Sequence, residues 1–198
     1  MNRLQALATA AILALTPLAA SAAPSTDIAQ MPAGHYAVDK THASITGHVL
    51  HQGYSFFTFR FSRFDADFDF NPATPDKTAL KVTVDVPSFS SGYDKADTEF
   101  PVEFLGADKN PTVTLVSTGL AHTGDKGVLA GDLTLNGVTK PVKLDVVFHG
   151  FGASGGGTRA GFSAKTVIKR SDFGSTKLAP MIGDDVAIDI EIEFKKPA

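Results

Sequence analysis

A β-hairpin is encoded in the stretch Gly131-Asp-Leu-Thr-Leu-Asn-Gly-Val-Thr-Lys-Pro-Val-Lys-Leu-Asp-Val-Val-Phe148. Its centre is Asn136-Gly137, a dipeptide that strongly favours a two-residue type I′ turn because both turn residues need a positive φ. On either side apolar and polar residues alternate, which is typical of strands with one buried face. The turn also sets the register. It predicts four cross-strand pairs: Leu135 with Val138, Leu133 with Lys140, Gly131 with Val142, and Leu129 with Leu144.

This register places the apolar residues of both strands on one face. That face carries Leu129, Leu133, Leu135, Val138, Val142, Leu144, Val146 and Phe148. Pro141 falls opposite Asp132, at a pair where the missing N–H of proline is not needed for bonding across the hairpin. The turn, the alternation and the proline therefore agree on antiparallel hairpins with one apolar face.

The same two-residue period recurs along most of the chain. It predicts further strands around residues 45–49, 57–61, 66–70, 80–86, 113–118, 162–168 and 186–194. Residues 94–105 are compatible with a helix but contain Pro101, so short helical turns are expected there. An all-β domain of eight or nine strands can form a sandwich or an up-and-down barrel. Sequential hairpins with short turns favour an antiparallel barrel of about eight strands, whose interior is either filled or holds one small ligand.

The N-terminal residues predict export. Arg3 gives a positive start, residues 4–18 are apolar, and Ala20-Ser21-Ala22 resembles a cleavage site, so residues 1–22 are expected to be a secretory signal peptide. The apolar run is too short for a transmembrane helix, and no transmembrane segment is expected after cleavage. Residues 23–34 lack periodicity and are expected to form a loose leader.

Composition excludes several functions. The formal net charge is −3, which argues against nucleic acid as a partner. The chain contains no cysteine, so it has no thiol nucleophile and no thiolate metal site. Fifteen phenylalanines and no tryptophan predict a bulky interior with few polar groups.

No catalytic or metal-binding constellation stands out. The six histidines do not form a ligand set with recognisable spacing, and no metal or cofactor is expected. A Gly-x-Ser-x-Gly elbow is absent. The run Gly155-Gly156-Gly157 lacks the lysine and the following helix of a phosphate loop, which favours a hairpin turn.

Inward-facing residues instead predict an apolar pocket. Its expected lining includes Phe57, Phe59, Phe61, Val82, Val84, Phe148, Phe162 and Ile168. Ile45, Gly47 and His51 share one parity in an earlier strand and are expected on the same interior face. Arg170 and Phe173 follow directly on the strand ending near Ile168 and are expected at the entrance. Small-molecule sites commonly use such concave apolar surfaces.

Two polar features keep two interpretations open. His51 is either a histidine hydrogen-bonded to a neighbour or a polar contact at the mouth of the cavity. Arg170 and Asp172 form either a salt-bridged strand end or a polar rim around the entrance.

Several stretches together resemble the YceI-like family of exported bacterial proteins. They are Tyr36-Ala-Val-Asp-Lys-Thr-His42, Ser44-Ile45, His51-Gln-Gly53, Leu133-Thr-Leu-Asn-Gly-Val-Thr-Lys-Pro-Val142, Ile168-Lys-Arg-Ser-Asp-Phe-Gly174 and Gly183-Asp-Asp-Val186. The resemblance implies a lipocalin-like barrel over residues 35–196, with a cavity for a polyisoprenoid or quinone-type lipid. It further implies a periplasmic location, no established catalysis, and a homodimer as one option for the assembly.

Two departures from the family pattern bear on the site. Gly47 stands where the family often has phenylalanine, which suggests a wider cavity. Ser91-Gly92 and Lys95-Ala96-Asp97 replace a Thr-Gly and an Arg-Asp pair, so a head-group contact is not carried over to them.

Three functional hypotheses follow. The first is a periplasmic carrier or store of an isoprenoid lipid. The second is a lipid-modifying enzyme that uses His51 or the Arg170–Asp172 pair. The third is an accessory or stress-response protein of the cell envelope that acts through a partner.

Overall fold

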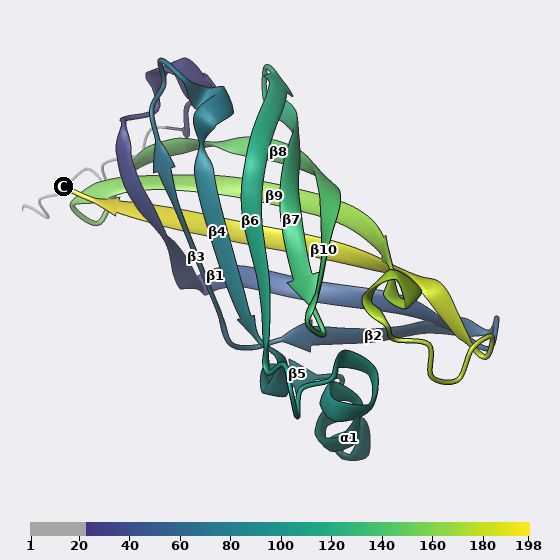
Figure 1. The fold of residues 1–198 in the computed structure, drawn as a ribbon. Helices are drawn as coiled ribbons and strands as arrows, with labels where there is room; N and C mark the ends of the chain where they lie inside the picture. The colour runs from purple at the N-terminus through teal and green to yellow at the C-terminus, as the bar shows by residue number, and fades with distance from the viewer. Residues whose placement is uncertain (1–22) are drawn as a thin grey trace, which may run out of the picture.

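The fold is a single antiparallel sheet that closes on itself, seen in a computed structural model that describes residues 23–198 (Figure 1). Its strands are β1 (Gly34–His51), β2 (Ser55–Phe61), β3 (Phe64–Phe70), β4 (Ala79–Asp85), β5 (Phe89–Ser90), β6 (Thr112–Thr123), β7 (Lys126–Leu135), β8 (Val138–Ser154), β9 (Gly157–Lys169) and β10 (Ile182–Pro197). The order around the barrel is β1-β3-β4-β6-β7-β8-β9-β10, and β10 pairs with β1 to close it. The predicted eight-stranded antiparallel barrel is confirmed.

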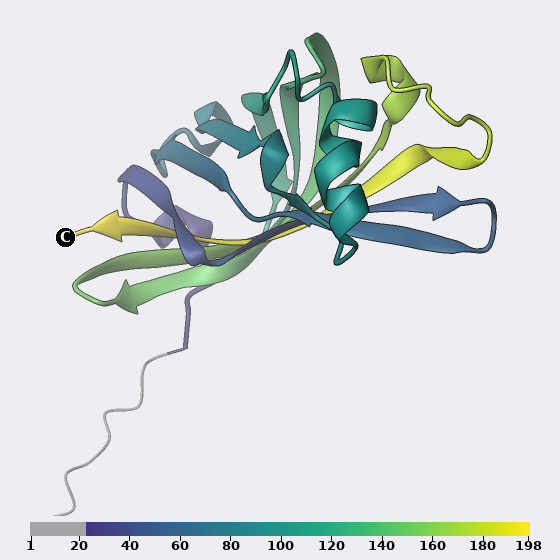
Figure 2. The same ribbon diagram turned by 90° about the horizontal axis from the view of Figure 1, so that it is seen from below.

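Strand β1 has two different neighbours on one of its edges. Residues 34–37 pair with β3, whereas residues 45–51 pair with β2. On the other edge β10 pairs with both halves, and the register shifts between Val38 and Ala43. The β1–β2 hairpin consequently extends beyond the barrel (Figures 1 and 2).

The hairpin of β7 and β8 has the predicted register. All four predicted pairs are present, and Asp132 lies opposite Pro141. Asn136 and Gly137 have φ values of 51° and 73°, as a type I′ turn requires. The Asn136 side chain also donates a hydrogen bond to the Phe173 carbonyl at 3.0 Å, which ties the turn to a distant loop.

Aromatic packing fills one end of the barrel. The Tyr36 ring stacks on Phe68 with centroids 5.1 Å apart, and Phe68 makes an edge contact with Phe194 at 4.8 Å. The remaining buried members of this cluster are Met31, Ala66, Phe70, Phe148 and Ala160. A second cluster of Leu115, Leu129, Leu144 and Ala164 occupies the middle of the barrel.

Four 3₁₀ helices and one α-helix complete the described residues. The 3₁₀ helices are η1 (Ile28–Gln30), η2 (Pro75–Lys77), η3 (Val86–Ser88) and η4 (Arg170–Phe173). The segment expected to form short helical turns is one continuous helix, α1 (Asp94–Leu105), which passes through Pro101. Proline removes one intrahelical hydrogen bond, but the Pro101 side chain is buried, and its packing holds the helix together.

The leader packs more firmly than expected. Ser25 exchanges two backbone hydrogen bonds with Phe151, at 2.8 and 2.9 Å, and Met31 is buried in the aromatic cluster. The predicted signal peptide, residues 1–22, lies outside the described residues. Within residues 23–198 no helix has the length and apolar character needed to cross a membrane.

Substitutions at Asn136 separate its two contributions to stability. Asn136→Ala should lower the free energy of unfolding by about 2–3 kcal/mol. Alanine is unfavourable in the left-handed backbone conformation, and it also lacks the side chain that donates the hydrogen bond to Phe173. Asn136→Gly keeps the turn conformation and should cost only about 1 kcal/mol. Urea unfolding measures both values, and equal costs for the two variants would contradict the turn assignment.

Candidate ligand-binding site

A cavity of about 750 Å³ occupies the end of the barrel that aromatic packing leaves open. Ligand pockets typically measure about 300–1,000 Å³, so the cavity is large enough for a small molecule. Its outer wall comes from β2, β5 and α1, and its inner wall from the barrel strands.

The outer wall is a set of interlocking phenylalanine rings. Phe59 on β2 stacks on Phe89 of β5 with centroids 4.9 Å apart. The ring centroids of Phe57 and Phe100 of α1 are 5.7 Å apart. Those of Phe100 and Phe104, one helical turn later, are 5.0 Å apart. These contacts hold α1 against the β1–β2 hairpin, so the helix covers the cavity with an aromatic face.

The inner wall is aliphatic. Its side chains come from the inward faces of β4 and β6–β10 and include Val82, Val84, Val113, Leu115, Leu133, Leu135, Val142, Leu144, Ile168, Val186, Ile188 and Ile190. Since polar groups are few, the cavity favours an apolar ligand held by burial.

Nine of the residues proposed from the sequence lie along this cavity: Ile45, His51, Phe57, Phe59, Phe61, Val82, Val84, Ile168 and Arg170. Four do not, namely Gly47, Phe148, Phe162 and Phe173. Phe148 and Phe162 have the inward parity, but their rings, 5.1 Å apart, pack in the filled end of the barrel. Alternation reveals the face of a strand, not the height of a residue along the barrel.

Gly47 does not widen the cavity. It lies directly opposite Phe59 in the β1–β2 pair, and a Cβ at this position would overlap the Phe59 ring. The ring therefore covers the glycine and fills the space that a side chain at position 47 would occupy.

Arg170 holds a loop instead of pairing with Asp172. Its guanidinium is buried and donates hydrogen bonds to four backbone carbonyls, those of Ser175, Lys177, Ile182 and Gly183, at 2.7–3.0 Å. Phe173 is buried and does not line the cavity. Among the described residues, Asp172 has no ion-pair partner, so neither a salt-bridged strand end nor a polar Arg–Asp rim is formed.

His51 lies at the mouth of the cavity. It is exposed, and its Nε2 is 3.5 Å from the Gln52 side-chain nitrogen. No carboxylate pairs with it within residues 23–198. The ring thus lacks the orienting acid that a general base in a catalytic dyad commonly has.

The sequence reasoning missed the contributions of residues 88–110. Phe89, Tyr93, Phe100, Phe104 and Leu105 all line the cavity. Phe100 and Phe104 are four residues apart, and this spacing places both on one face of a helix. This four-residue spacing is visible in the sequence, but Pro101, which lies between the two phenylalanines, favours short helical turns over a continuous helix.

Asp97 shapes the entry into α1. Its carboxylate accepts hydrogen bonds from the Ser91 amide and hydroxyl, both at 2.6 Å. These bonds with Ser91 lower the pKa of Asp97. Ser91 and Asp97 are both among the residues that depart from the family pattern. Their hydrogen bonds hold the loop that precedes α1 against the first turn of the helix.

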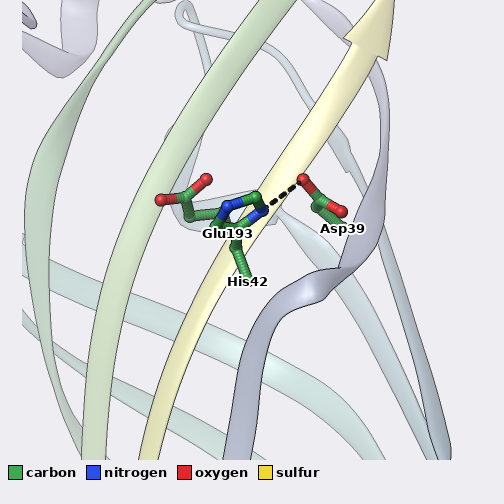
Figure 3. Close-up of side chains that lie close together, drawn as sticks. All are labelled: Asp39, His42 and Glu193. Atoms are coloured by element: carbon green, nitrogen blue, oxygen red, sulfur yellow. Dashed lines mark hydrogen bonds and ion pairs between the residues drawn. The ribbon is translucent and has the colours of Figure 1, made fainter.

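A cluster of polar side chains outside the cavity lining brings together Asp39, His42 and Glu193 (Figure 3). The geometry of three such side chains could suit a metal ion. However, Lys195 and Arg159 already contact the Asp39 carboxylate at 2.6 and 2.9 Å, and Arg159 also pairs with Glu193. These permanent cations neutralise the carboxylates, so the cluster is better described as an ion-pair network.

The fold and cavity place the chain among closed antiparallel barrels with an apolar interior. The YceI-like domain model matches residues 36–194, and the chain belongs to the YceI-like family. A UPF0312 protein of Pseudomonas aeruginosa is 39% identical over 149 residues, which cover 73% of this chain and 78% of the relative. Another UPF0312 protein, of Ectopseudomonas mendocina, is 37% identical over 169 residues, covering 83% and 88%.

Solved structures with the same fold are also known. Burkholderia cenocepacia BcnA aligns with a TM-score of 0.69 at 25% identity, covering 79% of this chain and 98% of its own. A polyisoprenoid binding domain from Saccharophagus degradans aligns with a TM-score of 0.62, covering 84% and 100%. Its identity of 15% shows a shared fold alone.

Replacing the arginine clamp should loosen one wall of the mouth. Arg170→Lys keeps the charge, but a single ammonium cannot reach four carbonyls in two directions. Hydrogen bonds to charged groups contribute about 1.5–3 kcal/mol, so amide exchange in residues 175–183 should accelerate by about tenfold or more. Hydrogen exchange monitored by mass spectrometry tests this, with Lys165→Arg as the control. Unchanged protection of the loop would contradict the clamp.

The ion-pair network predicts a pH-dependent stability difference. Lys195, then Thr41 and His42, hold the pKa of Asp39 well below its usual range. Ionised Asp39 therefore stabilises the folded state at pH values above its unfolded pKa of about 3.9, and this contribution is lost as the pH falls below that value.

Asp39→Asn should thus lower the melting temperature most near neutral pH, and its difference from wild type should shrink between about pH 4 and pH 2. Thermal unfolding followed by circular dichroism measures this difference. The exposed Asp76→Asn serves as the control. A difference that does not change with pH would contradict the role assigned to Asp39.

Proposed function

We propose that this protein binds a polyisoprenoid or quinone-type lipid in its apolar cavity, and acts as a periplasmic carrier or store of that lipid. The observation that carries the proposal is the cavity of about 750 Å³ between an aromatic and an aliphatic wall. A branched hydrocarbon chain can pack against both walls without any specific polar contact.

Burial supplies enough free energy for such a ligand. Each buried CH₂ contributes about 0.8 kcal/mol, so a five-carbon isoprene unit contributes roughly 3 to 4 kcal/mol before the cost of ordering the chain. Two or three units inside the cavity would therefore support binding without a charged head-group site.

Two further points support the proposal. The Saccharophagus degradans domain of the same fold is described as polyisoprenoid binding. The N-terminal residues carry the features of a secretory signal, which is the basis for proposing the periplasm. The enzymatic alternative gains nothing from the geometry, since Arg170 is engaged by backbone carbonyls and His51 lacks an acidic partner among the described residues.

A block inside the cavity tests the proposal. Val84 lies on the inner wall, and Val84→Trp fills space that the lipid would need. Val167 points out from β9 and is 62% exposed, so Val167→Trp is the matched control. All proteins would be expressed with their native leader, purified without detergent and extracted with organic solvent for mass spectrometry.

Wild type and Val167→Trp should yield a long-chain isoprenoid, and Val84→Trp should yield about tenfold less or lower, as a loss of about 1.4 kcal/mol would produce. Circular dichroism checks that the variants fold. Absence of any isoprenoid from the wild-type extract, or equal amounts in all three proteins, would contradict the proposal.

A further inference from the structure

Two segments project at the mouth of the cavity and lie side by side. One is the β1–β2 turn, and the other is the loop of residues 174–181 that leads into β10 (Figures 1 and 2). The backbone N–H of Gln52 donates a hydrogen bond to the backbone carbonyl of Met181 at 2.7 Å. Gly183 lies against the backbone and Cβ of Leu50. The two segments therefore form one continuous projection.

This projection exposes large apolar side chains. Tyr54 is 87% exposed and Phe56 65%, while Met181 and Leu178 are about half exposed. Leu50, paired with Phe56 across the hairpin, adds to the same surface. We call these five residues the apolar rim. Exposed apolar groups of this size in one place commonly mark a site of interaction.

The rim is continuous with the cavity. Phe56 and Leu178 line the cavity as well as being exposed, and His51 and Ile182 lie between rim and interior. A hydrocarbon chain entering or leaving would therefore have apolar side chains, those of Phe56, Leu178 and Ile182, along its path.

The charge of the projection differs from that of the chain. The chain carries 21 acidic residues, yet residues 40–64 and residues 173–183 contain none. The same segments carry His51 and Lys177 near the mouth, and Lys177 pairs with Glu103 of α1 at 2.7 Å, so that this nearby carboxylate is neutralised. A surface of phospholipid phosphates is negatively charged, so it would meet no opposing carboxylate on these two segments.

We propose that the apolar rim docks the protein on a phospholipid bilayer, with the mouth of the cavity facing the membrane. The inference rests on the proposed function, because a bilayer is the phase from which an apolar chain would be taken and to which it would be returned. Tyrosine and phenylalanine side chains are suited to the boundary between head groups and acyl chains. Side chains at the tips of two projecting loops can insert separately into a fluid bilayer.

Vesicle flotation tests the docking. Vesicles of phosphatidylethanolamine and phosphatidylglycerol should carry the wild-type protein to the top of a density gradient. The Tyr54→Ser/Met181→Ser double variant, in which neither residue lines the cavity, should partition about tenfold less, because two interfacial apolar anchors are lost. Val167→Ser removes a similarly exposed valine on β9 and should bind like the wild type.

A fluorescent reporter gives a second measurement that does not depend on removing side chains. The chain has no tryptophan, so Tyr54→Trp introduces a single indole at the tip. Its emission should shift to shorter wavelength when vesicles are added, whereas that of Val167→Trp should not shift. No flotation of the wild type and no shift at position 54 would overturn the proposal.

Two further outcomes separate this inference from others. The cavity-blocked Val84→Trp variant should still float with vesicles, and the rim double variant should still retain lipid already bound. Lipid retention without vesicle binding would overturn the docking alone, and vesicle binding without lipid in any extract would overturn the proposed function alone. If analytical ultracentrifugation shows that the rim instead joins two copies, and the double variant is a monomer that floats like wild type, the docking proposal is also overturned.

Discussion

The architecture depends on the backbone pairing of β1, which keeps β10 on one edge and exchanges β3 for β2 on the other. Where β1 pairs with β3, the side chains of Tyr36, Phe68 and Phe194 pack together and fill the interior. Where β1 pairs with β2, the hairpin leaves the barrel and the wall must be completed by β5 and α1. The partner exchange therefore divides one sheet into a packed end and a hollow end.

Buried polar groups stabilise the places where the chain departs from regular strands. Asp39 lies in the stretch between Val38 and Ala43, where the β1–β10 register shifts, and cations from β9 and β10 neutralise its carboxylate. Arg170 lies where β9 ends, and its guanidinium donates hydrogen bonds to backbone carbonyls of the following loop. Neither side chain is free to serve a ligand, because an unpaired buried charge would be costly. The cavity itself is lined mainly by apolar side chains, which favour the burial of apolar groups.

The sequence was sufficient for the barrel and for much of the cavity wall. Asn136-Gly137 and the alternating strands on either side of it determine register locally, and local signals survive in a single sequence. The height of a residue along the barrel depends on strand stagger, a long-range property, and this is why Phe148 and Phe162 were assigned to the cavity although they fill the closed end. The role of Gly47 depends on the exact register of the β1–β2 hairpin, which places Phe59 opposite it, and that of Arg170 depends on backbone carbonyls, which no residue pattern reveals. The α1 wall was missed because Pro101 is a helix breaker in isolation, whereas burial of its ring overrides that tendency here.

The central claim is that the space between the aromatic and aliphatic walls is the site of an apolar chain. A crystal structure of the protein purified with its native lipid tests this most directly. The account predicts continuous elongated electron density between Phe57 on β2 and Val84 on β4, opening toward the tip of the β1–β2 hairpin. Rings of Phe59, Phe89 and Phe100 collapsed into the cavity, or lipid bound only outside the barrel, would contradict it.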